Sequence, residues 1–194
     1  MRKSLKYLLL LLALVSSCRK DNKVIPIEKA AHSGPPVISG DTVADNAKLR
    51  IELFKDSTDF DETLLIFKKT SKLSYSPDED VAYFQGFGQV SLSTVSSDQR
   101  NLTINGLPYS PGLTVPLNVG ALADGTVSFA ISYEYNMPPL LQIWLIDHYL
   151  KDSVNLSTTN YKFAIVKSDS NSFGNKRFCI KFIYKPYIQT TAPH

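Results

Sequence analysis

The chain has 194 residues and two cysteines, with 21 Lys and Arg against 18 Asp and Glu. Three of the basic residues, Arg2, Lys3 and Lys6, precede an apolar run at residues 8–15, and the rest of the chain carries 18 charges of each sign. This balance excludes the strong basic footprint that nucleic-acid binding requires, and we expect no nucleic-acid partner. About 150 residues beyond the N-terminal region suffice for one well-buried domain.

The N-terminal segment predicts export. Its basic start is followed by the apolar run 8–15, which is too short for a bilayer-spanning helix of about 20 residues. The stretch Leu14-Val15-Ser16-Ser17-Cys18 then resembles the lipobox of bacterial lipoproteins, whose cysteine is acylated and becomes the new N-terminus. The resemblance implies a signal peptide at 1–17, lipid on Cys18 and a membrane as partner. An uncleaved anchor helix and an ordinary signal peptide are the alternatives.

Residues 18–46 predict a lipidated cysteine followed by a flexible tether. They are polar, lack a hydrophobic period and contain Ser33-Gly34-Pro35-Pro36, which together favour a coil with a reach of roughly 25 to 30 Å. Arg19-Lys20-Asp21-Asn22 resembles the charged export signal of surface lipoproteins of Bacteroidota. The expected location is therefore the outer membrane, with the domain exposed at the cell surface.

From Ala47 onward, apolar and polar residues alternate with a period of two, which indicates β-strands. Turn sequences such as Asn105-Gly106 and Asp124-Gly125 separate the runs. Pro116 indicates an edge or bulge position in its strand. We predict about ten strands, near 48–54, 63–68, 80–85, 89–95, 100–106, 113–119, 125–134, 140–148, 160–167 and 176–184. The fold predicted for 47–184 is an all-β, antiparallel, jelly-roll-like β-sandwich, followed by a tail at 185–194.

Several strand-end motifs, in this order, resemble a β-sandwich module of secreted Bacteroidota proteins that usually precedes the sorting domain for type IX secretion. The matching segments are Leu49-Arg50-Ile51, Asp61 to Phe67, Asp80 with Gly86, Val90 to Thr94, Leu102 to Pro108, Val115 to Val119, Leu145-Ile146-Asp147 and Arg177-Phe178. The chain departs from the module's pattern at Tyr75-Ser76 and Tyr83, and no sorting module follows Phe182. The resemblance implies an accessory surface module and no reaction.

Candidate catalytic groups are few. The histidines are His32, His148 and His194, and no Gly-x-Ser-x-Gly motif accompanies them. Asp147-His148 reads as a solvated turn at a strand end, and Cys179 as a small buried hydrophobic residue. We therefore expect no enzyme, no zinc site and no cofactor.

The sequence offers two candidate binding sites, one for calcium and one for a sugar ligand. Asp78 and Asp80 lie in an acidic loop and are calcium candidates, with solvated acidic turns as the alternative. Tyr133, Tyr135 and Trp144 are candidates for a ligand-binding platform, since sugars stack on flat aromatic rings. Three short segments resemble the O-glycosylation sequon of exported Bacteroidota proteins: Asp41-Thr42-Val43, Asp56-Ser57-Thr58 and Asp152-Ser153-Val154.

The expected function is that of a non-catalytic, lipid-anchored envelope module serving as an adhesive, a spacer or an accessory binding domain. The alternative is a surface glycan-binding lipoprotein associated with polysaccharide uptake. In either case the partners are the membrane, through Cys18, and a glycan or an envelope protein.

Overall fold

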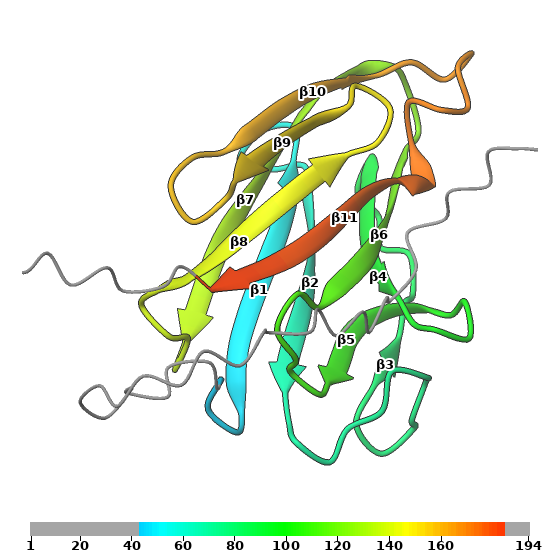
Figure 1. Ribbon diagram of the computed structural model, residues 1–194. Coiled ribbons are helices and arrows are strands. Elements are labelled where there is room, and N and C mark those ends of the chain that lie inside the picture. The colour runs from blue at the N-terminus through cyan, green and yellow to red at the C-terminus, as the bar shows by residue number, and fades with distance from the viewer. Residues whose placement is uncertain (1–42, 185–194) are drawn as a thin grey trace, which may run out of the picture.

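The computed structural model describes residues 43–184, which form an all-β body (Figure 1). The expected signal peptide, Cys18, most of the tether and the tail at 185–194 lie outside the described residues. The eleven strands are β1 (Ala47–Phe54), β2 (Phe60–Phe67), β3 (Val81–Ala82), β4 (Val90–Val95), β5 (Asn101–Leu107), β6 (Thr114–Ala121), β7 (Gly125–Tyr135), β8 (Leu141–Asp147), β9 (Asp152–Asn155), β10 (Tyr161–Ile165) and β11 (Gly174–Tyr184).

All eleven strands belong to one mixed sheet with the order β10-β7-β1-β2-β5-β4-β6-β11-β8-β9, and β3 pairs with β5. The paired strands are antiparallel except β2 and β5, which run parallel. The wholly antiparallel arrangement expected from the sequence is therefore wrong at this pair. The physical reason is the long connection through β3 and β4, which brings β5 alongside β2 in the same direction, as a tight hairpin cannot.

The sheet folds over on itself and is nearly barrel-shaped. Phe67 of β2 packs edge-to-face on Phe182 of β11, with ring centroids 5.2 Å apart, although several strands separate β2 from β11 in the sheet order. Phe129 of β7 meets Phe178 of β11 in the same way at 5.1 Å. In Figure 1, β8 and β11 accordingly cross in front of β7 and β1. The core lies between these two halves of the sheet.

Strand periodicity explains which side chains fill this core. In β1, the buried Leu49, Ile51 and Leu53 alternate with half-buried Arg50 and Glu52. Burying each large apolar side chain stabilises the fold by about 1.5–3 kcal/mol. Four phenylalanines on the inward faces of their strands are buried in the core, and they are Phe129, Phe163, Phe178 and Phe182.

All ten predicted strands are present, most with bounds that differ by a few residues, and one further strand occurs. The segment expected at 80–85 pairs only at Val81–Ala82, and β9 (Asp152–Asn155) was not expected. Strand β9 is short, polar and at one end of the sheet, so it shows no apolar alternation. Pro116 lies in the interior strand β6 and pairs with Cys179 of β11. The pairing of β6 with β4 starts only at Leu117, so the missing N–H of Pro116 leaves no gap in the ladder between β4 and β6.

The barrel has two distinct ends. At one end, the described chain begins at Val43, which is buried, and the Asn46 amide donates to the Phe67 carbonyl at 2.7 Å. The opposite end, called the far end below, carries the connections after β1, β3, β6, β8 and β10, at residues 55–59, 83–89, 122–124, 148–151 and 166–173. In Figure 1, the start of β1 is at the bottom, and the β6–β7 turn and the β10–β11 loop are at the top.

Candidate functional site

The most concentrated polar chemistry in the described part of the chain is a buried ion pair between Asp147 and Arg177. Both side chains are 1% exposed, whereas the three other ion pairs within residues 43–184 involve side chains that are at least one-fifth exposed. Removing two charges from water is costly unless they are paired and hydrogen-bonded, so this arrangement must satisfy both groups.

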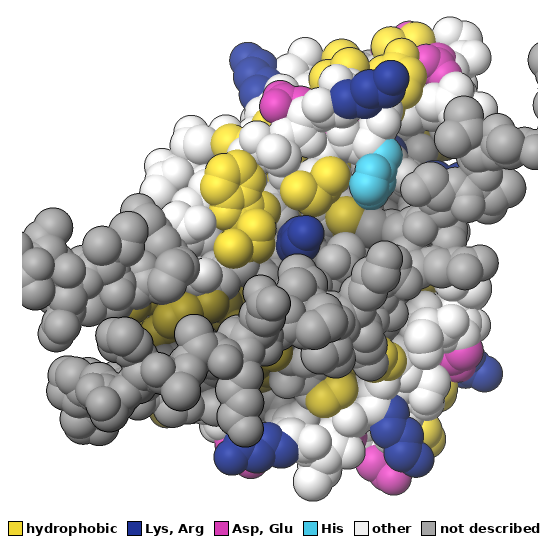
Figure 2. Space-filling view, viewed as in Figure 1, with side chains coloured by type: hydrophobic (Ala, Val, Ile, Leu, Met, Phe, Trp, Pro, Cys, Tyr) yellow, Lys and Arg dark blue, Asp and Glu magenta, His cyan; other side chains and the backbone are white. Residues whose placement is uncertain are grey.

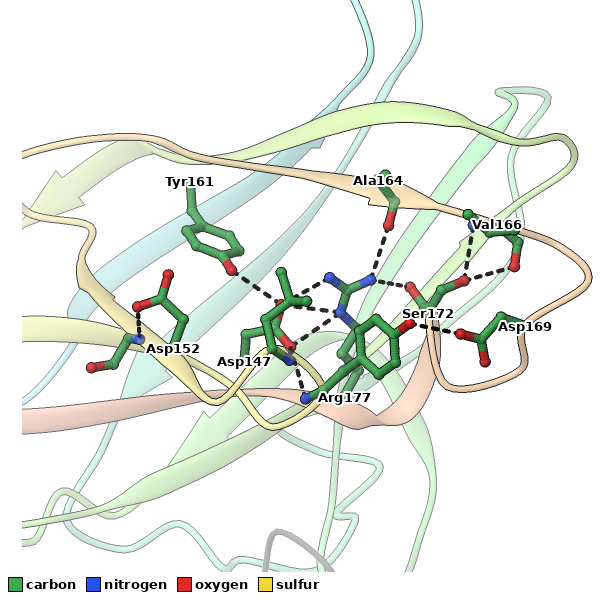
Figure 3. A network of polar contacts seen from close by, with 11 residues as sticks. Asp147, Asp152, Tyr161, Ala164, Val166, Asp169, Ser172 and Arg177 are labelled. Carbon is green, nitrogen blue, oxygen red and sulfur yellow. Dashed lines mark hydrogen bonds and ion pairs between the residues drawn. The ribbon is translucent and has the colours of Figure 1, made fainter.

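Asp147 ends β8, and Arg177 lies on the neighbouring β11 (Figure 3). The Arg177 Nε donates to both carboxylate oxygens at 3.2 and 3.1 Å, and its Nη2 donates to Oδ2 at 2.8 Å. The carboxylate also accepts from the Tyr161 hydroxyl at 3.1 Å, and from the amides of Tyr149 and Leu150 at 2.9 and 3.1 Å. Asp147 is thus fully engaged.

The rest of the Arg177 guanidinium is also engaged, by two carbonyl acceptors and three aromatic rings. Its Nη1 donates to the Ala164 carbonyl at 3.0 Å and to the Ser172 carbonyl. The centres of the Phe163 and Phe178 rings lie 4.7 and 4.6 Å from the guanidinium carbon, and the centre of the Tyr149 ring lies 5.0 Å from it. Aromatic faces favour a nearby cation, particularly one removed from water.

This network joins the two ends of the sheet. Asp147 comes from β8, next to the terminal strand β9, while Tyr161 and Ala164 come from β10, the terminal strand at the other end. Hydrogen bonds from the Asp147–Arg177 pair therefore span the seam where the nearly closed barrel lacks a strand pairing. Because both side chains are sealed from solvent, the geometry suits closure of the fold and gives a substrate no access.

The same surroundings set the ionisation of two tyrosines. Burial, together with the negative charge of Asp147, raises the pKa of Tyr161 to about 12, so the phenol keeps its proton as a donor. Tyr149 donates to Asp169 at 2.8 Å, and this hydrogen bond raises the pKa of the Tyr149 phenol. The Asn171 amide, followed by the Tyr149 hydroxyl, lowers the pKa of Asp169. Polar contacts at the seam thus continue through Tyr149 and Asp169 into the loops at residues 148–151 and 166–173.

The sequence predicts a solvated turn at Asp147-His148, and for Asp147 this prediction is wrong, because its side chain is buried. The signal that could have found it is the period of β8, since Leu141, Ile143, Leu145 and Asp147 share the inward face. His148 is exposed, as expected. Cys179 is buried, as expected, and its Sγ lies 3.4 Å from the His148 Nε2.

Tyr133 and Tyr135 do lie together, on the outer face of β7. A register shift opposite Arg50 and Ile51 reverses the inward and outward phases of β7, so that Tyr133 stands opposite Arg50 and Tyr135 opposite Lys48. The two tyrosines are 43% and 49% exposed. The Arg50 guanidinium lies 5.6 Å from the centre of the Tyr133 ring and 3.5 Å from Glu62.

Trp144 is not part of this group. It lies on β8, which is not adjacent to β7 in the sheet, and its indole N–H donates to Gln142 at 3.2 Å. Lys181 of β11 stands opposite Trp144, next to exposed Ile183. Figure 2 shows this side of the molecule, where hydrophobic side chains gather around a basic group over β8 and β11. The structure thus separates the three aromatic candidates into two surfaces.

The calcium candidates have different surroundings. Asp80 is buried, and its two carboxylate oxygens accept from the Gly106 and Ser76 amides, each at 2.7 Å. Asp78 is exposed. Within residues 43–184, no group of three or more His, Cys, Asp and Glu side chains is arranged to hold a metal ion. Asp80 closes its own loop, and calcium binding stays a prediction for calorimetric titration.

Comparison with protein-family models, with curated proteins and with solved structures found no match for this chain. The search of residues 43–184 for a helix with the length and hydrophobicity to cross a membrane also found none.

Proposed function

We propose that this protein is a lipid-anchored module of the bacterial cell envelope, held by acyl chains on Cys18 and acting without catalysis as an adhesive, a spacer or an accessory binding domain. Two acyl chains hold a soluble domain stably on a membrane where one is marginal. The proposal places the anchor in the outer membrane and the domain, a jelly-roll-like sandwich, on the cell surface.

The observation that carries the proposal is the lipobox-like segment ending at Cys18, followed by a self-contained β body whose first strand begins at Ala47. The body supports a scaffolding function because its strongest polar interactions point inward. Asp147 and Arg177 join strands from both ends of the sheet and present no charge to the surface. Such an arrangement gives a rigid unit that can be displayed on a tether.

The test is metabolic labelling with an alkyne fatty acid in a bacterium that expresses the full chain. We expect label on the wild-type protein and none on Cys18→Ala, with Cys179→Ala as the matched control that keeps the label. Label retained by Cys18→Ala would refute the anchor. Protease treatment of intact cells tests exposure, since survival of the domain would place it on the inner side of the membrane.

One observation favours glycan binding as the second candidate. Tyr133 and Tyr135 lie two residues apart on one face of β7, beside Arg50 and Lys48, which can donate hydrogen bonds to sugar hydroxyls. Retardation in gels containing polysaccharide should weaken for Tyr133→Ala and Tyr135→Ala. Trp144→Phe is the control on the other surface and should not change retardation. Equal retardation of all variants and wild type would exclude this surface.

A further inference from the structure

The far end of the barrel gathers exposed apolar side chains. Eleven large hydrophobic side chains are exposed in the described part of the chain, and seven lie on or beside the far-end connections. These are Phe60, Phe84, Phe87, Leu122, Tyr149, Leu150 and Val166. Scattered exposed apolar residues are normal, but a group at one end marks an interaction surface.

Hydrogen bonds join the far-end connections into one surface. Gln89, which precedes β4, contacts both the β1–β2 turn and the β6–β7 turn. Further hydrogen bonds connect the β6–β7 turn to the β10–β11 loop, and that loop to the β8–β9 turn. The bonds are Lys55 Nζ to the Gln89 side chain at 3.0 Å, Gln89 N to Asp59 at 2.8 Å, Leu122 N to Gln89 O at 2.8 Å, Lys167 N to Asp124 at 2.6 Å and Tyr149 hydroxyl to Asp169 at 2.8 Å.

The most prominent feature of this surface is an aromatic tip made by Phe84 and Phe87. Their side chains are 90% and 110% exposed. The loop that carries them is fixed on its β3 side, where the Tyr83 amide donates to the Asn101 carbonyl and its hydroxyl to Asp61, both at 2.8 Å. Both phenylalanines therefore project from a fixed base.

The chemistry around the tip favours a lipid surface. No charged residue occurs from residue 81 to residue 97, so the tip can leave water without desolvating a charge. The neighbouring turns carry both positive and negative side chains, which can contact the polar headgroups of a bilayer. These residues are Lys55, Asp56, Asp124 and Lys167.

The shape of the far end supports the same occupant. The hollow between the β1–β2 and β6–β7 turns, lined by Lys55, Gln89 and Asp124, measures only about 10 Å³, which is too small for a sugar ring. A projecting aromatic pair needs a matching groove in a protein partner, whereas the interfacial region of a bilayer accepts it without one. We propose that the far end docks on a lipid bilayer by inserting Phe84 and Phe87 into the interface.

This docking goes beyond the proposed function and is compatible with it. The 24 residues between Cys18 and Val43 span up to roughly 80 Å when extended, at about 3.3 Å per residue. The eight residues of β1, which runs from the Val43 end to the far end, measure about 25 Å. An acylated Cys18 and the aromatic tip can therefore reach the same membrane, and two weak contacts hold more firmly than one.

Depth-dependent quenching tests the tip itself. Trp144 is the single tryptophan, so Trp144→Phe provides a silent background into which Phe87→Trp introduces one reporter. The full chain is reconstituted in phosphatidylcholine vesicles with and without brominated acyl chains. We expect the Phe87→Trp reporter to shift to the blue and to lose most of its emission in brominated vesicles. The matched control is Tyr135→Trp in the same background, at the opposite end, which should keep its emission.

Equal emission of the two reporters with and without bromine would overturn the proposal, and so would a Phe87→Trp reporter that shifts only when envelope proteins are added. Circular dichroism of each variant confirms that the fold is kept. Repeating the measurement on Cys18→Ala separates the two proposals. Quenching that persists without acylation supports the tip alone, while an acylated protein without quenching supports the anchor alone.

Discussion

Removing one partner of the buried ion pair should destabilise the protein far more than removing any other ion pair described above. In Asp147→Asn the neutral amide leaves the Arg177 guanidinium buried and unbalanced, while hydrogen bonds to Ala164 and Ser172 keep it in place. Breaking a buried pair in this way costs about 3–5 kcal/mol. Since domains are stable by about 5–15 kcal/mol, the loss is a large fraction of the total.

The measurement is equilibrium unfolding in urea, followed by the fluorescence of Trp144, three residues before Asp147 on β8. With a denaturant slope of about 2 kcal/mol/M, the midpoint should fall by about 2 M. Glu62→Gln is the control, because its ion pair with Arg50 is 40% exposed on both sides, and it should change the free energy of unfolding by less than about 1 kcal/mol.

A double-mutant cycle with Arg177→Met separates pairing from simple burial. Met fills much of the space of the Arg177 stem without a charge, so the double variant should lose clearly less than the sum of the two single variants, with a coupling of about 2 kcal/mol. If Asp147→Asn costs no more than Glu62→Gln, or if the two single losses simply add, then the pair does not stabilise the seam as argued.

Three further predictions concern the same fold. Folding raises the pKa of Tyr161 from 10.0 to about 12, so the contribution of its phenol to stability is complete below pH 10 and is lost as the pH rises toward 12. Over that range the free energy of unfolding of the wild type should fall more steeply than that of Tyr161→Phe, and parallel curves would contradict the raised pKa. Asp80→Ala leaves the buried Gly106 amide without its acceptor and should cost about 1–3 kcal/mol in urea unfolding, whereas Asp78→Ala, at an exposed position, should be nearly neutral. Phe178→Ala removes a ring that contacts Phe129, Phe163 and Tyr161 and should cost about 3–5 kcal/mol, a loss that exposed Phe84→Ala should not reproduce in thermal unfolding.

The sequence alone determined ten of the eleven strands and, in most of them, which side chains point inward. Alternation over a few residues is a local property, because neighbouring side chains on a strand must point to opposite sides wherever the strand pairs. This is why the segments around Leu49 and Phe129 were predicted with nearly their observed bounds. The same alternation continues to Asp147, which shares the inward face of Leu141, Ile143 and Leu145, but its charge favoured the solvated turn, which is wrong.

Tertiary structure decided everything that depends on partners far away in the chain. The pairing of Asp147 with Arg177, 30 residues later, makes burial of the carboxylate tolerable, and no local pattern encodes that partner. The register shift opposite Arg50 turned Tyr133 and Tyr135 outward, and the sheet order separated them from Trp144. Register and strand order are set by long-range contacts, so candidate residues could be read from the sequence, but only the folded sheet determined which of them share a surface.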